Sequence, residues 1–414
     1  MGLLPRYPAN DYVRLALSAG LVESTMRLAS RIDKVPPYPF VEITRKINQK
    51  RAEGVDVITF AIGDPDIPTP DHILQSLHTA VDDPPNHRYP ESDGLPEFRQ
   101  AVAEWYAKRF GLTFDRDKEV LPLLGSKEGI ANIAYALIDP GDVALVPDPG
   151  YPVYSIATMF AGGEPYLMPL KEENAFLPDY SEIPEEILRR ARVLWINYPN
   201  NPTSAVADIS FYEETVAFAK KWDLAVCHDA AYSEVAFDGY KPVSFMQAEG
   251  ARDIGIEFHS LSKSYNMTGW RIGMAVGNAE LIRGLFVIKS NVDSGVNQAI
   301  QKMGITALEG DQACIAENNA TLQKRRDLLV AALQACGLRI QTPKASLYVW
   351  ARIPDGHTSA EFATRLIEDI AVVVTPGTNF GKAGEGFVRL SLTAPDDRVE
   401  EGARRITEWA KQNS

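Results

Sequence analysis

Short apolar segments alternate with helical patterns between Pro96 and Val276, and this alternation constrains the fold more than any other feature of the sequence. Amphipathic stretches of helical length, such as Phe211–Trp222, separate most of the apolar segments. Parallel strands need crossover connections and are buried on both faces, so the pattern indicates a mostly parallel sheet covered by helices. The predicted strands are Val120–Leu124, Val143–Val146, Val193–Ile196, Leu224–His228, Glu257–Leu261 and Met274–Val276.

The chain on either side of this region has a different pattern. Two Pro-rich stretches, Val35–Pro39 and Gly63–Pro70, hold the backbone extended. Between them we expect a helix and then a strand, and after Asn297 two long helices followed by a smaller α+β region. These further elements are the helices Phe40–Glu53, Gln298–Glu309 and Ala313–Ala335 and the strands Val55–Ile62, Ser346–Ala351 and Phe387–Leu392.

A chain of 414 residues exceeds the size at which one hydrophobic core stops growing, so two domains are expected. We expect an N-terminal extension over residues 1–30. Residues 31–60 and 298–414 are expected to form a small domain, and residues 61–297 a large one.

Composition excludes several classes of function. The formal net charge of −13 disfavours nucleic acid or an anionic membrane as a general partner. The three cysteines are scattered, and the six histidines form no metal-binding spacing, so neither a disulfide framework nor a metal site is expected. The first thirty residues contain charges throughout and lack a signal-peptide core, and no apolar run is long enough to span a bilayer. We therefore expect a cytoplasmic protein.

The polar motifs follow the predicted strands, and ligands bind at the carboxyl ends of the strands in such sheets. In the stretch from Ser260 to Gly273, Lys263 follows a strand and Arg271 comes eight residues later. A lysine that forms a Schiff base needs neighbours and burial that lower its pKa. Ser260, Ser262 and Arg271 are donors of the kind that bind a phosphate. Taken alone, the Ser-x-Ser-Lys pattern occurs by chance and favours a solvated surface lysine.

A second candidate anion site lies at Gly125-Ser126-Lys127, which precedes a predicted helix. The backbone N–H groups at the start of a helix, together with its dipole, favour an anion. Two other motifs are dismissed. Gly377–Ala383 is one residue shorter than a P-loop, and no G-x-G-x-x-G follows a strand, so a nicotinamide cofactor is not expected.

Together these motifs resemble those of the class I/II aminotransferases, which have the fold type I of enzymes dependent on pyridoxal 5'-phosphate. The likeness runs in order from about Val35 to the C-terminus. It rests on Tyr89 with Gly94–Arg99, Gly125–Gly129, Asp148–Tyr154, Asn200–Thr203, Asp229–Tyr232, the lysine motif and Val388–Ser391. The resemblance implies a large domain with a mostly parallel seven-stranded sheet, a smaller α+β domain and pyridoxal 5'-phosphate as cofactor.

The resemblance also assigns roles to individual residues. Lys263 is expected to hold the cofactor covalently, Asp229 to face the pyridine nitrogen and Arg389 to bind the substrate α-carboxylate. The expected catalytic residues are Lys263, Asp229 and Tyr232. The expected cofactor-binding residues are Tyr89, Ser126, Lys127, Tyr151, Asn201, Asp229, Tyr232, Ser260, Ser262, Lys263 and Arg271. The expected substrate-binding residues are Tyr38, Gly63, Lys127, Tyr151, Asn201, Asn297 and Arg389.

In the family, the residues matching Tyr89 and Asn297 act across a subunit interface, which implies a homodimer with shared active sites. The stretches Pro36–Ile43 and Gly54–Ile73 are similar to those of LL-diaminopimelate aminotransferases, and Ser264–Arg271 also fits that subgroup. This likeness implies amino transfer between LL-2,6-diaminopimelate and 2-oxoglutarate, in lysine biosynthesis.

The alternatives are an aspartate, alanine or broad-specificity aminotransferase, which share the catalytic motifs. A β-eliminating lyase on the same fold is less favoured. A non-catalytic regulator is disfavoured too, because no DNA-binding domain precedes the fold and the chain is acidic.

Overall fold

The computed structural model describes residues 28–33, 35 and 40–413. Contacts divide the chain into the unit Met1–Pro36 and the compact unit Pro37–Ser414. In the first unit, residues 30–33 form a turn, and the amide of Ile32 donates a hydrogen bond of 2.9 Å to the carbonyl oxygen of Ala29. Most of the predicted N-terminal extension lies outside the described residues.

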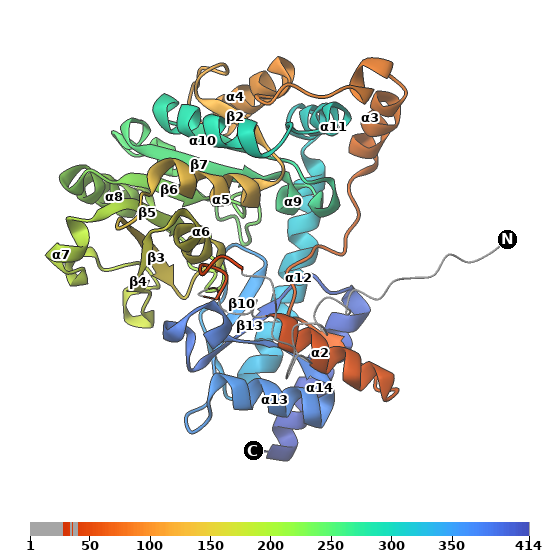
Figure 1. Cartoon of the computed structure of the whole chain (residues 1–414). Coiled ribbons are helices and arrows are strands. Elements are labelled where there is room, and N and C mark those ends of the chain that lie inside the picture. Colours follow the sequence, from red (N-terminus) through yellow and green to blue (C-terminus); the bar gives the residue numbers. More distant parts are fainter. Residues whose placement is uncertain (1–27, 34, 36–39, 414) are drawn as a thin grey trace. The chain divides into compact units, whose positions relative to one another are not determined.

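The second unit contains a seven-stranded sheet in the order β2-β8-β7-β6-β5-β3-β4 (Figure 1). Strand β8 is antiparallel to β2 and β7, whereas the pairs from β7 to β4 are all parallel. The strands are β2 (Val120–Leu123), β3 (Val143–Asp148), β4 (Glu164–Pro169), β5 (Ala191–Asn197), β6 (Ala225–Asp229), β7 (Gly255–Ser260) and β8 (Gly273–Gly277). The predicted mostly parallel, seven-stranded sheet is confirmed.

The inner strands of the sheet are mainly apolar because both of its faces are covered. Within β3, Val143 and Leu145 belong to one hydrophobic core, whereas Ala144 and Val146 belong to another. The first core also contains residues of α4 (Pro96–Phe110), α8 (Ile209–Trp222) and α11 (Gln298–Glu309). The second contains residues of α5 (Ser126–Leu137), α6 (Val153–Ala161) and α10 (Ala279–Val292). Side chains alternate across a strand, so a strand that is buried on both faces contributes to both layers.

A second, smaller sheet has the antiparallel order β12-β13-β10-β9, and a separate parallel pair joins β1 to β11. These strands are β1 (Ile58–Thr59), β9 (Arg339–Ile340), β10 (Tyr348–Arg352), β11 (Val372–Val373), β12 (Thr375–Pro376) and β13 (Phe387–Ser391). The remaining α-helices are α2 (Phe40–Ala52), α3 (Asp71–Val81), α7 (Glu185–Leu188), α9 (Leu261–Ser264), α12 (Ala313–Ala335), α13 (Ser359–Ile370) and α14 (Asp396–Asn413).

The small sheet has its own core, to which α12, α13 and α14 contribute (Figure 1). The predicted division at residues 60 and 297 stays a prediction. Among the described residues, no helix combines the length and the apolarity needed to cross a membrane.

Candidate active site

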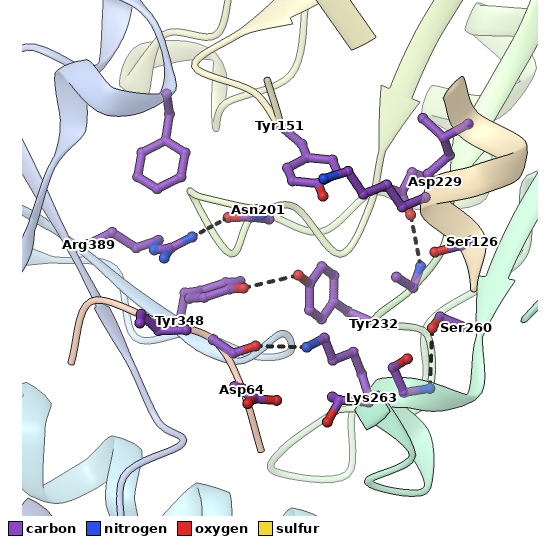
Figure 2. Close-up of a pocket in the computed structure, with 18 of the residues that line it drawn as sticks. Asp64, Ser126, Tyr151, Asn201, Asp229, Tyr232, Ser260, Lys263, Tyr348 and Arg389 are labelled. Carbon is purple, nitrogen blue, oxygen red and sulfur yellow. Dashed lines mark hydrogen bonds between the residues drawn. The ribbon is translucent and has the colours of Figure 1, made fainter. Parts of the chain in front are cut away.

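A cavity of about 440 Å³ gathers most of the predicted site residues (Figure 2). It is lined by Gly63, Ser126, Lys127, Tyr151, Asn201, Asp229, Tyr232, Ser260, Ser262, Lys263, Arg271 and Arg389. The lining also includes residues that the sequence did not single out, namely Ile62, Asp64, Ile130, Ala231, Thr268, Tyr348 and Phe380.

Three predicted site residues are not among those that line the cavity. The ring of Tyr89 is 87% exposed. Asn297 caps α11, where its Oδ1 accepts hydrogen bonds from the amides of Ala299 (2.9 Å) and Ile300 (3.4 Å). Tyr38 lies outside the described residues. The roles assigned to all three stay predictions.

Lys263 lies on α9, the short helix that begins directly after β7. Its Nζ donates a hydrogen bond of 2.7 Å to the carbonyl oxygen of Gly63. Burial lowers the pKa of Lys263 to about 8, and Arg271 and Arg389 act in the same direction, whereas Asp64 opposes them. At this pKa about a tenth of the amine is neutral at pH 7, and a nucleophile or a base requires the neutral form.

Asp229 is the last residue of β6 and is buried. Its Oδ2 accepts a hydrogen bond of 2.7 Å from the hydroxyl of Tyr154, and its Oδ1 accepts one of 3.3 Å from the amide of Ala231. Burial raises the pKa of Asp229, and these two hydrogen bonds oppose the rise. Tyr154, which belongs to the Asp148–Tyr154 motif, was not assigned this contact from the sequence.

Asn197, the last residue of β5, ties the neighbouring loop to Asp229. Its Nδ2 donates a hydrogen bond of 2.7 Å to the carbonyl oxygen of Asp229. Its Oδ1 accepts one of 2.8 Å from the amide of Asn201. Strands β5 and β6 are paired so that Asn197 lies opposite Asp229, and the loop that carries Asn201 is thus fixed beside the strand end.

Arg389 lies in the middle of β13 and is 2% exposed. Its Nη1 donates to Oδ1 of Asn201 at 2.8 Å, and its Nη2 donates to the carbonyl oxygen of Ala61 at 2.7 Å. The guanidinium carbon lies 4.1 Å from the ring centre of Tyr348 and 4.4 Å from that of Phe380. Two polar contacts and two aromatic faces therefore hold one buried cation at the edge of the cavity.

The sequence analysis did not identify Tyr348 as a site residue, because its position in the sequence is typical of a buried residue in a strand. Its hydroxyl lies 3.1 Å from that of Tyr232, and Figure 2 shows it between Tyr232 and Arg389. Gly63 makes this placement possible, since a Cβ atom there would lie 2.2 Å from the Tyr348 hydroxyl. Asp64, also missed, belongs to no motif that marks it as a site residue.

The other end of the cavity is built to bind an anion. Helix α5 begins at Ser126, and Arg271 packs against the preceding Gly125 so closely that a Cβ atom there would lie 2.4 Å from Nη2. The hydroxyl of Ser262 is buried and has no hydrogen-bond partner among the described residues. A helix N-terminus, a guanidinium and an unsatisfied hydroxyl together fit a phosphate group.

Comparisons with known proteins agree with this geometry. The sequence profile described as "Aminotransferase class I and II" matches residues 55–406. The LL-diaminopimelate aminotransferase of Dehalococcoides mccartyi (strain ATCC BAA-2266 / KCTC 15142 / 195) is 60% identical over 387 residues, which cover 94% of this chain and 100% of the relative. That of Syntrophobacter fumaroxidans (strain DSM 10017 / MPOB) is 52% identical over 378 residues, covering 91% and 97%.

Among solved structures, substrate-bound BacF from Bacillus subtilis superposes with a TM-score of 0.88. It is 37% identical in sequence, and the match covers 93% of this chain and 98% of BacF.

Proposed function

Because this chain belongs to the class I and II aminotransferases, we propose that it transfers an amino group from LL-2,6-diaminopimelate to 2-oxoglutarate, with pyridoxal 5'-phosphate as cofactor. The choice of substrate is supported by relatives named LL-diaminopimelate aminotransferase, which are 52 to 60% identical over nearly the whole chain. The observation that carries the proposal is a single cavity shared by Lys263, with its lowered pKa, by Asp229 and by an anion site.

The residues present fit the cofactor. Its phosphate would be held at the N-terminus of α5 by Ser126, Lys127, Ser260, Ser262 and Arg271. The unsatisfied hydroxyl of Ser262 and the close packing of Arg271 on Gly125 support this assignment. When bound, the cofactor withdraws electrons from the substrate α-carbon.

The other end of the cavity would orient the cofactor ring. Asp229 would pair with the pyridine nitrogen, and the Tyr154 hydroxyl and the Ala231 amide favour its ionised form. Tyr232 and Asn201 would donate to the phenolic oxygen, and Tyr151 would lie against the ring. Asn197 forms hydrogen bonds with both the Asn201 amide and the Asp229 carbonyl. These bonds hold Asn201 at a fixed position relative to Asp229.

Arg389 would bind the α-carboxylate of the amino donor and of the oxo acid in turn. Its guanidinium is already fixed by Asn201, Ala61 and two aromatic rings, so little side-chain freedom is lost when a substrate binds. A planar guanidinium binds a carboxylate through two parallel hydrogen bonds and thereby orients the Cα–H bond of the substrate. Tyr348 lies against this arginine and helps to exclude water from it.

Lys263 would move the proton. Its lowered pKa makes the neutral amine accessible near neutral pH, so Nζ can take the proton from the substrate α-carbon and return it in the second half-reaction. The carbonyl oxygen of Gly63 accepts a hydrogen bond from Nζ at 2.7 Å and so fixes the direction of the amine.

We further propose that the enzyme is a homodimer, in which Tyr89 and Asn297 complete the site of the partner subunit. The high exposure of Tyr89 supports a role outside its own cavity. The reducing cytoplasm is proposed as its location, because Cys227, Cys314 and Cys336 are all free thiols.

The test is a panel of amino donors offered with 2-oxoglutarate, including LL-diaminopimelate, aspartate and alanine, with glutamate formation measured. We expect LL-diaminopimelate to give the highest kcat/KM and Lys263→Ala to abolish turnover with every donor. Preference for another donor would overturn the substrate assignment. With an added donor that carries a leaving group on Cβ, such as cystathionine, release of pyruvate and ammonia instead of glutamate would indicate a β-lyase.

A further inference from the structure

The segment Gly377–Gly384 lies between β12 and β13 and contains the glycine-rich sequence that is one residue shorter than a P-loop. It forms two short 3₁₀ turns, Gly377–Phe380 and Lys382–Gly384. Its ends approach each other so closely that a Cβ atom on Gly377 would lie 2.0 Å from the carbonyl oxygen of Gly384. Glycine at these two positions therefore lets the segment fold back on itself.

Phe380 lies in the middle of this segment and lines the active-site cavity. Its side chain is buried, and its ring centre lies 4.4 Å from the guanidinium carbon of Arg389. Trp350 of β10 packs edge-on against the same ring, with the two ring centres 6.3 Å apart. An aromatic face stabilises a desolvated cation and keeps water from it. Phe380 thus covers the cation to which the proposed function assigns the substrate α-carboxylate.

The end of β3 holds the segment in place at Phe380. Asp148, the last residue of β3, accepts a hydrogen bond of 3.1 Å from the amide of Ala383 through its Oδ1. The same oxygen lies so close to Gly381 that a Cβ atom there would be 1.9 Å from it. Two residues after Asp148, the amide of Gly150 donates a hydrogen bond of 2.8 Å to the carbonyl oxygen of Phe380. A distant part of the chain therefore fixes the main chain at Phe380 and directly after it.

Asp148 is buried but does not itself line the cavity within the part of the chain that the structure describes. Its effect on a substrate must therefore pass through the residues that it contacts. It belongs to the same turn as Tyr151, which does line the cavity and would lie against the cofactor ring. The turn after β3 thus carries both a cofactor contact and the support of Phe380.

We propose that Phe380 covers the α-carboxylate site and that Asp148 is a positioning residue, which acts on that site through Phe380. This inference rests on the proposed function, because the α-carboxylate role of Arg389 is part of it. Without the covering ring, water reaches the guanidinium and the pair that it forms with a carboxylate weakens, since charges attract less strongly where the local dielectric constant is higher. Affinity for carboxylate substrates therefore depends on an aspartate outside the cavity.

The first test compares two phenylalanines that lie over two different arginines. In the cofactor-loaded protein, Phe380→Leu should weaken the binding of glutarate, an unreactive relative of 2-oxoglutarate, by about 10-fold, as measured by calorimetry. Phe387→Leu is the matched control. Phe387 belongs to the same core and is equally buried, but its ring lies 4.5 Å from the guanidinium carbon of Arg352. The control should leave glutarate affinity unchanged.

The second test is a double-mutant cycle between Asp148 and Phe380. Asp148→Ala should raise the KM for 2-oxoglutarate about as much as Phe380→Leu does, with a much smaller effect on kcat. Added to Phe380→Leu, it should have little further effect, because the ring through which it acts is already absent. Asp148→Asn keeps an oxygen that can accept from the Ala383 amide, so it should restore most of the affinity. If Asp148→Ala does not fold, Gly381→Ala disturbs the same contact from the other side.

The possible outcomes separate this inference from the function on which it rests. Unchanged glutarate affinity in Phe380→Leu, or an equal loss in Phe387→Leu, would show that Phe380 does not cover the carboxylate site. Additive losses in the cycle, or a loss of cofactor affinity in Asp148→Ala, would show that Asp148 acts by another route, such as Tyr151. All these results leave amino transfer itself intact. If the native protein transfers no amino group, the proposed function fails, and the comparison of the two phenylalanines by glutarate binding still decides the role of Phe380.

Discussion

The Nζ atom of Lys263 lies 2.7 Å from the carbonyl oxygen of Gly63, although 200 residues separate the two in the chain. Gly63 follows β1, which pairs only with β11, and Lys263 follows β7 of the large sheet. This hydrogen bond therefore joins the segment after β1 to the large sheet at the amine that carries the chemistry. The loop of Gly63 is itself anchored, because Asp66 pairs with Arg325 of α12 at 2.6 and 3.0 Å.

The lowered pKa of Lys263 predicts a pH-dependent stability of the cofactor-free protein. The folded chain binds fewer protons than the unfolded chain between about pH 8 and the ordinary lysine pKa of 10.5. The contribution of Lys263 to the free energy of unfolding is thus fully present above about pH 10.5 and is lost as the pH falls through about 8. The difference across this range is about 3 kcal/mol.

Urea denaturation of the native protein and of Lys263→Met at several pH values measures this contribution. The free energy of unfolding of the native protein, minus that of the variant, should rise with pH through this window. The tyrosines and other lysines titrate in both proteins and cancel in the difference. A difference that is constant with pH would contradict the depressed pKa of Lys263.

Gly63→Ala tests the close approach of the backbone to Tyr348. The added Cβ atom would lie 2.2 Å from the Tyr348 hydroxyl, so the ring must move away from Arg389 and Tyr232. We expect kcat/KM to fall at least ~10-fold, which corresponds to about 1.4 kcal/mol. Gly269→Ala is the matched control, because nothing lies within 4 Å of a Cβ atom there. Equal kinetics of the two variants would show that the Gly63–Tyr348 contact is dispensable.

The inner strands were predictable from the sequence because burial on both faces leaves short segments that are mainly apolar. Helices α11 and α12 have the bounds that their sequence patterns predict. The edge strand β4 was missed, since Glu164 and other exposed residues interrupt its apolar pattern. The strand predicted over residues 55–62 is wrong in length. Only Ile58 and Thr59 pair, with the equally short β11.

The site was predictable where a residue belongs to a motif, and much less so elsewhere. Lys263, Asp229 and Arg389 do line one cavity. Tyr348 was not predictable, because its importance comes from the neighbouring chain segments that bring Gly63, Tyr232 and Arg389 to it. The buried Glu257 was missed for a related reason, since its hydrogen-bond partners are spread over several elements; they are Tyr106, His228, Ser244, Phe245 and His259.

The proposed dimer predicts complementation between two inactive variants. We expect Tyr89→Ala to be nearly inactive, because each subunit then fails to supply a phosphate contact to its partner's site. We expect Lys263→Ala to be nearly inactive as well, because each subunit's own site then lacks the amine. Mixed after dissociation and reassociation, they should form hybrid dimers with one intact site and recover up to about a quarter of native activity. Sedimentation of the mixture checks the oligomeric state. A monomer with full turnover at assay concentration would refute the shared site.

Arg389→Lys tests whether one cation serves both half-reactions. The guanidinium contacts Asn201 and Ala61 and lies against two aromatic rings, and lysine cannot reproduce its planar pair of donors. The cofactor-binding residues are separate from this strand, so cofactor affinity should be retained. Because the lost carboxylate pair is desolvated, kcat/KM should fall at least ~10²-fold, or about 3 kcal/mol.

The decisive observation is how this loss divides between the two substrates. Both the amino donor and the oxo acid carry an α-carboxylate, so single-turnover rates of the two half-reactions should fall together. Arg352→Lys provides a control, since this arginine lies on the neighbouring strand β10 and pairs with Glu172 outside the cavity. If only the donor half-reaction suffers in Arg389→Lys, the arginine binds a distal group of the donor and another residue holds the α-carboxylate.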